Sequence, residues 1–299
     1  MSSLDELLES TSRTFAVAIP LLPEPTRGEV TIAYLLFRIA DTFEDADGWP
    51  RADRLAALEE LGALIENADF MRAKKLADRW LARPPSEHDG YLDLLAQTPA
   101  VIAALGAVPA AARKILAHHT LRTVRGMSRI VSLSDQNGRL ALATIEELRQ
   151  YCYIVAGIVG ELLTDLFLHD APQLARRADV LHATKVIFGE ALQLVNILRD
   201  SDDDAHGGRR YLPAGRRGDV MALAVADVDE ASRYVEALAE AGAPRGLVAF
   251  TAFLLLLARS TLDRVEAQGP GAKVARVEVK RLVEHVVSSP VDRILRYPA

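Results

Sequence analysis

Apolar and polar positions follow a helical period along almost the entire chain. Apolar side chains return every three or four residues, and alanine, leucine, arginine and glutamate, which favour helices, are abundant. Alternating β-branched stretches bounded by turn residues, the pattern of strands, scarcely appear. We therefore predict an all-α protein. Its predicted helices cover residues 4–10, 25–45, 51–66, 68–81, 91–105, 109–133, 145–168, 174–205, 220–241, 247–266 and 276–287.

Short groups of glycine and proline separate the predicted helices. They include Pro23-Glu24-Pro25, Gly48-Trp49-Pro50, Gly207-Gly208 and Gly269-Pro270-Gly271, which favour turns. With 299 residues, half of them hydrophobic, the chain can bury a substantial core as one domain or as two closely joined ones. No break is a long linker and the composition does not shift, so we predict one domain over residues 1–299.

Two acidic segments, Asp41-Thr42-Phe43-Glu44-Asp45 and Asp200-Ser201-Asp202-Asp203-Asp204, interrupt otherwise apolar helices. In each, the first and last aspartates are four residues apart, which places both carboxylates on one helix face. Like charges repel there, and Mg²⁺ is a cation that prefers such oxygen ligands and links carboxylates to phosphates. The alternative is a solvated surface, but residues 34–40 and 191–198 are too apolar for helices exposed all round. We predict that the two segments face each other and bind a diphosphate through metal ions.

Polar residues one or two turns before the aspartates extend the same helix faces. Arg38 lies three residues before Asp41, and Gln193, Asn196 and Arg199 precede the second acidic segment. One guanidinium group can donate two parallel hydrogen bonds to phosphate oxygens. Side-chain amides can donate to phosphate or orient metal-bound water. These four residues are candidate diphosphate ligands.

Two further segments combine arginine with hydroxyls or glycines. Thr11-Ser12-Arg13-Thr14-Phe15 can cap a helix or bind phosphate. The segment from Gly207 to Pro213 directly follows the second acidic segment; its glycines let the backbone approach a ligand, and Arg209 adds positive charge. Taken alone, this segment indicates only the end of a helix followed by a turn. Its position beside Asp204 favours a phosphate-binding role.

Two apolar helices are candidates for lining a site that binds a hydrocarbon chain. Gly157 and Gly160, in a helix with Tyr151, indicate either close helix packing or a gap that admits an isoprenoid chain. In the second case Tyr151 would lie near the reacting centre as a proton acceptor or as a π-face for a cation. Phe250 and Phe253 lie in the longest apolar run, where the ordinary role is the core and the alternative is the wall of a carbocation pathway.

Charge and cysteine content limit the partners and the compartment. A net charge of −6 argues against nucleic-acid binding, which needs a strongly basic surface. The single cysteine, Cys152, suits a reducing cytoplasm. The longest apolar run, residues 247–258, is shorter than the roughly 20 residues that span a bilayer. We therefore expect a cytoplasmic protein without a transmembrane anchor, and we leave peripheral membrane contact open.

Together these residues resemble the squalene/phytoene synthase family, the head-to-head isoprenyl diphosphate synthases. The segments 41–45 and 196–204 are similar to its two aspartate-rich motifs, although Asp203 stands where the family usually has glutamate. Segments 11–15, 151–160 and 208–213 resemble three further signatures, in the same order. The chain departs from the family at Ser128-Arg129-Ile130, where members often carry a further acidic or aromatic residue. The carboxy-terminal anchor of eukaryotic squalene synthases is not expected here.

The resemblance implies an isoprenoid synthase fold, a single helical bundle around a central cavity, and a Mg²⁺-dependent condensation of two allylic diphosphates through presqualene diphosphate. It implies that Tyr151 assists proton removal. The catalytic residues we predict are Tyr151, Asp41, Asp45, Asp200, Asp204 and Phe250. The predicted metal ligands are Asp41, Asp45, Asn196, Asp200, Asp203 and Asp204. The predicted diphosphate ligands are Thr11, Arg13, Thr14, Arg38, Gln193, Asn196, Arg199, Arg209 and Tyr211.

The form of the first acidic motif favours one product within this family. Asp-Thr-Phe-Glu-Asp is closer to the Asp-Thr-Leu-Glu-Asp of squalene synthases than to typical phytoene synthases, which favours farnesyl diphosphate and squalene. Squalene formation also requires NADPH, for which the sequence has no dinucleotide fingerprint. Dehydrosqualene, presqualene diphosphate, and phytoene from geranylgeranyl diphosphate are the alternatives.

Two other classes of protein are alternatives to a head-to-head synthase. A class I terpene cyclase, acting on one prenyl diphosphate, would share the acidic segments but would not need the Tyr151 signature or the second set of arginines. A non-catalytic helical binding protein should have lost one or more of the metal-binding carboxylates, and all of them are present.

Overall fold

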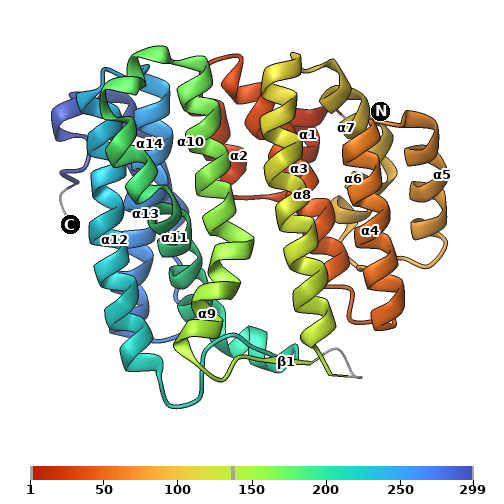
Figure 1. The fold of residues 1–299 in the computed structure, drawn as a ribbon. Coiled ribbons are helices and arrows are strands. Elements are labelled where there is room, and N and C mark those ends of the chain that lie inside the picture. Colours follow the sequence, from red (N-terminus) through yellow and green to blue (C-terminus); the bar gives the residue numbers. More distant parts are fainter. Residues whose placement is uncertain (1–2, 136–138, 298–299) are drawn as a thin grey trace. The chain divides into compact units, whose positions relative to one another are not determined.

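The computed structural model describes residues 3–135 and 139–297. Helices form nearly all of it (Figure 1), and the only strands among the described residues are the paired β1 (Leu140–Ala141) and β2 (Arg209–Arg210). The prediction of an all-α protein is confirmed. The chain divides into two compact units, unit 1 with residues 1–20 and 24–138, and unit 2 with residues 21–23 and 139–299. The prediction that one domain covers residues 1–299 stays a prediction.

Unit 1 packs helix α8 against α3 and α4, and the fully buried Leu35, Ile39 and Phe43 belong to its core. The predicted helix at 91–105 is two helices, because Pro99 stands in the first turn of a new helix, where a missing N–H is tolerated. The 3₁₀ turn η1 (Ile19–Leu21) follows α2. The α-helices of unit 1 are α1 (Leu4–Thr11), α2 (Phe15–Ala18), α3 (Thr26–Glu44), α4 (Arg51–Asn67), α5 (Phe70–Leu81), α6 (Asp89–Ala96), α7 (Thr98–Ala107) and α8 (Ala110–Leu133).

Unit 2 is arranged around its longest helix, α11, which packs against α10, α12 and α13. The predicted helix at 145–168 contains a π-helical turn, η2 (Tyr153–Gly157), between α9 and α10. Two short 3₁₀ turns, η3 (Pro172–Arg177) and η4 (Val291–Arg293), complete the unit. Its α-helices are α9 (Ile145–Cys152), α10 (Ile158–Asp170), α11 (Ala178–His206), α12 (Arg217–Glu240), α13 (Arg245–Gln268) and α14 (Arg276–Ser288).

Helix α11 approaches α10 and the π turn η2 backbone to backbone at two glycines. A Cβ added to Gly160 would lie 2.0 Å from the carbonyl oxygen of Lys185, and one added to Gly189 would lie 2.1 Å from that of Ala156. Real Cβ atoms do not come so close, so both positions require glycine. Of the two interpretations of Gly160, close helix packing is therefore the one that the structure supports.

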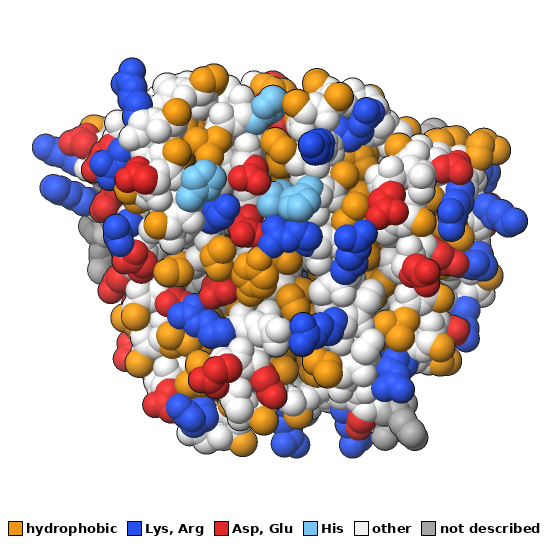
Figure 2. All heavy atoms as spheres, in the orientation of Figure 1, with side chains coloured by type: hydrophobic (Ala, Val, Ile, Leu, Met, Phe, Trp, Pro, Cys, Tyr) orange, Lys and Arg blue, Asp and Glu red, His pale blue; other side chains and the backbone are white. Residues whose placement is uncertain are grey.

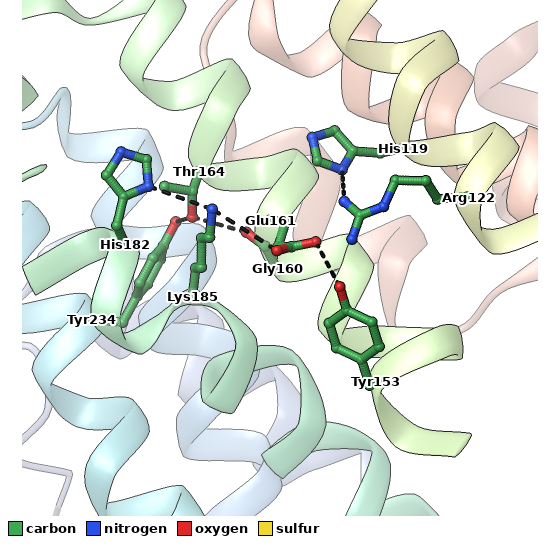
Figure 3. Close-up of polar contacts among 9 residues, drawn as sticks. All are labelled: His119, Arg122, Tyr153, Gly160, Glu161, Thr164, His182, Lys185 and Tyr234. Carbon is green, nitrogen blue, oxygen red and sulfur yellow. Dashed lines mark hydrogen bonds and ion pairs between the residues drawn. The ribbon is translucent and has the colours of Figure 1, made fainter. Parts of the chain in front are cut away.

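Polar contacts accompany this crossing (Figure 3). The Thr164 hydroxyl donates to the carbonyl oxygen of Gly160 at 2.8 Å and lies 2.8 Å from the hydroxyl of Tyr234 on α12. Lys185 of α11 lies 4.0 Å from Glu161 of α10. Tyr234 is fully buried, and burial raises the pKa of its hydroxyl above the ordinary value. These contacts satisfy the polar groups that the close packing buries.

Two stretches, Ile145–Asp170 and Arg245–Gln268, are long and apolar enough to cross a membrane by length and composition. In the structure 61% and 72% of their apolar windows are buried inside the protein. This degree of burial is typical of helices in the core of a folded unit. On the molecular face in Figure 2, basic and acidic side chains are interspersed with apolar ones.

Candidate active site

The first acidic segment is the C-terminal end of α3, in unit 1. Asp41, Glu44 and Asp45 each offer a carboxylate oxygen, and these oxygens lie within 4.8 Å of one another. Asp41 is half-buried, Glu44 is buried and Asp45 is exposed. Oxygen ligands this close together suit a hard divalent cation. Glu44 was not among the residues predicted from the sequence, although it lies three residues after Asp41 on the same helix.

Aromatic packing and a buried arginine fix the backbone of this segment. The Phe43 ring stacks on Trp49 at 6.0 Å and meets the edge of Trp80 at 4.7 Å between centroids. Arg54 of α4, which is 2% exposed, donates to the carbonyl oxygens of Phe43 and Glu44. The last carbonyls of a helix lack partners within it and attract cations, so Arg54 anchors the end of α3. The sequence analysis missed Arg54.

Arg38 connects the acidic segment to neighbouring tyrosines. Its Nη1 lies 2.5 Å from Asp41 Oδ2, and its Nε donates to the Tyr34 hydroxyl at 3.3 Å. The guanidinium also lies 5.3 Å from the centre of the Tyr91 ring, within the range of a cation–π contact. Burial raises the pKa of Tyr91, and the nearby Arg38 partly offsets this. Tyr34 and Tyr91 were not among the predicted site residues.

Tyr34 carries the connection on to the Thr11–Phe15 segment, since its hydroxyl donates to the carbonyl oxygen of Thr11 at 3.0 Å. The Thr11 hydroxyl donates to Leu7 within α1, at 2.7 Å. The hydroxyl that caps the following turn is that of Ser12, which accepts from the Phe15 amide at 2.9 Å. Capping is thus one role of this segment. Arg13 is exposed and Thr14 is half-buried, and their role toward a diphosphate stays a prediction.

The second acidic segment is the C-terminal end of α11, in unit 2. Arg199 pairs with the carboxylate of Asp200 through two contacts, Nε to Oδ1 at 2.7 Å and Nη2 to Oδ2 at 2.5 Å. Burial, with help from the charges of Asp200 and Asp203, raises the pKa of Asp204 to about 6, although Arg209 and Arg199 oppose the shift. Burial and the neighbouring aspartates thus disfavour the ionised form of this carboxyl group.

In both acidic segments, therefore, an arginine already pairs with the first aspartate. Arg38 holds Asp41 and Arg199 holds Asp200. Each pair is partly exposed, so it contributes little to stability, but it places a guanidinium beside the predicted metal ligand. Gln193 and Asn196 are half-buried on the turns of α11 before Asp200, whereas Asp203 is exposed.

The turn after α11 is attached to the start of the α9 segment by β1 and β2. The Leu140 amide donates to the carbonyl oxygen of Gly208 at 3.3 Å, and the Leu142 amide donates to that of Arg210 at 2.9 Å. Gly208 has a φ of +81°, which side chains rarely adopt, so glycine suits this turn. The strand pairing thus fixes the backbone of Arg209 beside Leu140, just after the end of α11.

Tyr151 and Tyr211 meet across this attachment. Their rings stack with centroids 4.3 Å apart and 25° between planes, and both side chains are buried. Two residues that the sequence assigns to different roles, catalysis and diphosphate binding, are thus neighbours. Phe250 and Phe253 are 1% and 0% exposed within the packed α13. Their burial agrees with core roles, and a catalytic role of Phe250 stays a prediction.

The predicted residues thus form two local groups, one in each unit. Unit 1 carries Asp41, Asp45 and Arg38, and unit 2 carries the second acidic segment with Tyr151 and the turn at 208–213. The prediction that both groups bind one diphosphate across a cavity stays a prediction.

Comparison with known proteins identifies related sequences and folds. A family model described as squalene/phytoene synthase matches residues 8–216. The squalene synthase of Schizosaccharomyces pombe is 31% identical over 211 residues, which are 70% of this chain and 43% of that protein. Squalene synthase BSS of Botryococcus braunii is 31% identical over 214 residues, 71% of this chain and 41% of that protein. The chain matches less than half the length of either relative.

Solved structures share the fold at lower sequence identity. A ligand complex of TcSQS has a TM-score of 0.73 at 22% identity and covers 95% of this chain and 85% of its own. A ligand complex of a dehydrosqualene synthase has a TM-score of 0.60 at 19% identity, with 95% and 94% covered. The predicted fold class, an all-α isoprenoid synthase fold, is therefore confirmed.

Proposed function

The chain belongs to the squalene/phytoene synthase family, and from this premise we propose that it joins two farnesyl diphosphates head to head through presqualene diphosphate, with squalene as the product. The observation that carries the proposal is the repeated arrangement of carboxylates and arginine. Each acidic segment ends a long helix and has an arginine on its first aspartate. A single-diphosphate enzyme would share the two acidic segments, whereas the second set of arginines and Tyr151 suit the coupling of one diphosphate to another.

The carboxylates fit Mg²⁺ by their chemistry and spacing. In unit 1 the oxygens of Asp41, Glu44 and Asp45 lie within 4.8 Å of one another. In unit 2 burial and the charges of Asp200 and Asp203 raise the pKa of Asp204, and a bound cation would favour its ionised form. We assign Asp41, Asp45, Asn196, Asp200, Asp203 and Asp204 to this role. Bound Mg²⁺ would supply electrophilic stabilisation of the diphosphate oxygens as the C–O bond breaks.

The arginines would receive the anionic leaving group. Arg38 and Arg199 now neutralise Asp41 and Asp200, and their remaining N–H groups can donate to diphosphate oxygens. Arg209 lies in the turn that follows α11, a few residues after Asp204. Arg13, Thr11, Thr14, Gln193, Asn196 and Tyr211 complete the proposed diphosphate-binding set.

Tyr151 would act on the hydrocarbon part of the reaction. In the first step a C–O bond of one farnesyl diphosphate breaks, and the double bond of the second supplies the electron pair of the new C–C bond. Loss of a proton then closes the cyclopropane ring of presqualene diphosphate. Tyr151 is buried and stacked on Tyr211, so its ring is held in one orientation and is shielded from water. A dry aromatic surface protects the cation until the proton leaves.

The conversion of presqualene diphosphate to squalene requires a hydride, which NADPH would supply. We include NADPH as a co-substrate of the proposed reaction. Without it, dehydrosqualene or presqualene diphosphate becomes the expected product, and phytoene is the alternative when geranylgeranyl diphosphate is the substrate.

For the cell, we propose a cytoplasmic protein that contacts membranes peripherally. The thiol of Cys152 is buried, and burial raises its pKa, so a persistent reduced state is compatible with the fold. The two apolar stretches are mostly buried. Fractionation of cells that produce the chain should leave it in the soluble fraction after a wash in high salt. Resistance to such a wash would contradict peripheral contact.

The test of the reaction is incubation of the purified protein with farnesyl diphosphate and Mg²⁺, with and without NADPH, followed by mass spectrometry. We expect a C30 hydrocarbon that is squalene only when NADPH is present. Geranylgeranyl diphosphate in a parallel reaction separates phytoene synthesis from this activity. Cyclic products of a single farnesyl diphosphate, and no C30 compound, would identify a class I terpene cyclase instead.

A further inference from the structure

One arginine joins three helices of unit 2 close to Tyr151. Arg149 lies in the last turn of α9, and its Nη1 is 2.6 Å from Glu190 Oε2 on α11. The same guanidinium contacts both oxygens of Asp227 on α12, Nη2 to Oδ1 at 2.9 Å and Nη1 to Oδ2 at 2.6 Å. Neither carboxylate nor the arginine belongs to the site residues described above. We call Arg149, Glu190 and Asp227 the three-helix ion cluster.

The cluster is buried and contains more negative than positive charge. The side chains of Glu190 and Asp227 are 9% and 8% exposed, and that of Arg149 is 31% exposed. Burial raises the pKa of both carboxyl groups, and Arg149 opposes the shift in each case. A buried ion pair adds little net stability compared with apolar packing, but a planar guanidinium imposes one geometry on the groups it bridges.

The position of the cluster suggests what this geometry controls. Arg149 lies two residues before Tyr151, and the π-helical turn η2 begins two residues after that tyrosine. Such a turn breaks the regular α-helical hydrogen bonding, so α10 does not hold the end of α9 in a standard helical register. On the other side, Glu190 belongs to α11, the helix whose C-terminal end carries Asp200 and Asp204. Arg149 thus connects the turn that bears Tyr151 to the helix that bears the second acidic segment.

We propose that Arg149 is a positioning residue, which with Glu190 and Asp227 holds the end of α9 against α11 and α12 and so fixes Tyr151 relative to the second acidic segment. The stack on Tyr211 fixes the tyrosine ring, and the ion cluster fixes the backbone from which it projects. This inference rests on the proposed function for its kinetic consequences, but the placement of α9 can be measured without any activity.

The kinetic test separates positioning from simple charge balance. Arg149→Lys keeps the charge, but an ammonium group cannot bridge two carboxylates in the geometry of the fork. The triple variant Arg149→Met, Glu190→Gln, Asp227→Asn removes all three charges and leaves no buried ion without a partner. Arg233→Lys is the control, because Arg233 forms an exposed pair with Glu230 on the same helix as Asp227.

We expect kcat to fall by about 10-fold to 100-fold in Arg149→Lys and in the triple variant, while KM for farnesyl diphosphate stays within about threefold, because a small displacement of a reacting group affects the chemical step. The triple variant should unfold at a temperature close to that of the wild type. Wild-type kcat in a stable triple variant would overturn the proposal, since charge balance alone would then account for the cluster.

Amide hydrogen exchange provides the readout that does not depend on activity. We expect exchange in residues 145–152 to accelerate by about tenfold in Arg149→Lys and in the triple variant but not in Arg233→Lys, because local opening reports the loss of the contacts that hold α9. Unchanged exchange in both Arg149 variants would contradict the proposal. If the wild type lacks coupling activity, the proposed function fails, and the exchange result still decides the structural role of Arg149.

Discussion

The rings of Tyr151 and Tyr211 stack with their centroids 4.3 Å apart. Tyr151 lies in the last turn of α9 and Tyr211 follows β2, so the contact joins the proposed catalytic tyrosine to the turn after the second acidic segment. The parallel pairing of β1 with β2 supports the same attachment. The turn proposed to bind diphosphate and the tyrosine proposed to act in catalysis are therefore directly in contact within unit 2.

This stack can be tested by changing Tyr211. Tyr211→Leu keeps an apolar side chain but removes the aromatic contact, which contributes about 1 kcal/mol beyond burial. We expect urea unfolding to show a loss of that size and kcat to fall. Tyr211→Phe, which keeps the stack, should retain the stability of the wild type. Equal stability in the wild type and both variants would show that the stack does not contribute to the free energy of unfolding.

The two acidic segments should be essential for turnover but not for folding. We expect Asp41→Asn and Asp200→Asn each to lower kcat by about 100-fold or more, because a charged oxygen ligand of the leaving diphosphate is lost. Circular dichroism should remain unchanged. Asp78→Asn, at an exposed position paired with Lys74, is the control and should keep full activity. Near-normal activity in either segment variant would contradict the assigned metal role.

The raised pKa of Asp204 predicts a pH-dependent effect on stability. Its pKa of about 6 lies above the ordinary 3.8, so the folded protein binds this proton more tightly than the unfolded chain does. The carboxylate therefore weakens folding above pH 6, and this penalty disappears below pH 4. We expect Asp204→Asn to stabilise the metal-free protein at pH 7 by on the order of 1 kcal/mol, after allowance for solvent screening.

Thermal unfolding in EDTA across pH 4 to 7 measures this effect. The difference between Asp204→Asn and the wild type should decrease toward zero at pH 4. A constant difference over the whole range would show that an uncharged contact, and not the ionisation of Asp204, is responsible.

Arg54 should be important for the stability of unit 1. Arg54→Met leaves the carbonyl oxygens of Phe43 and Glu44 without their buried donor, and we expect a loss of about 2–3 kcal/mol in the free energy of unfolding. Arg125→Met is the control, because Arg125 pairs with Glu66 at the surface of the same unit. If the two variants unfold at the same urea concentration, Arg54 does not anchor α3.

The close crossing of α10 and α11 predicts a strong effect of a single methyl group. In Gly160→Ala the added Cβ would overlap the backbone of Lys185, so the helices must separate, at a cost of about 3 kcal/mol or more. A Cβ at Gly218, which also lies in a helix, meets nothing within 4 Å. Gly218→Ala should therefore unfold at or above the wild-type temperature, and an equally mild effect of Gly160→Ala would contradict the close packing.

Helical periodicity was sufficient to predict most of the fold, because the apolar positions on each helix determine which face is buried. It did not predict the division between α6 and α7, where Pro99 lies inside an apolar pattern that continues across the break. Nor did it predict the π turn at Tyr153–Gly157, for which the local sequence carries no distinct signal. The pairing of β1 with β2 depends on strands nearly 70 residues apart in the sequence.

The site could be predicted where its chemistry depends on local spacing. The four-residue spacing of Asp41 and Asp45 placed their carboxylates together, and the same spacing selected Asp200 and Asp204. Arg149 was missed because its partners are 41 and 78 residues away and lie on other helices. Such long-range contacts leave no periodic pattern in the sequence, so they can be recognised only in the folded chain.

The most direct test of the central claim is a coupling reaction with an equal mixture of unlabelled and fully deuterated farnesyl diphosphate, with Mg²⁺ and NADPH. Head-to-head condensation predicts three classes of C30 product by mass spectrometry, with no labelled half, one labelled half and two labelled halves. The product with two labelled halves should lack one deuterium, because one deuteron leaves when the cyclopropane ring closes and the hydride comes from unlabelled NADPH. With Asp200→Asn the mixed product should form at least about 100-fold more slowly. Products that contain only one farnesyl unit, with no mixed species, would contradict the account.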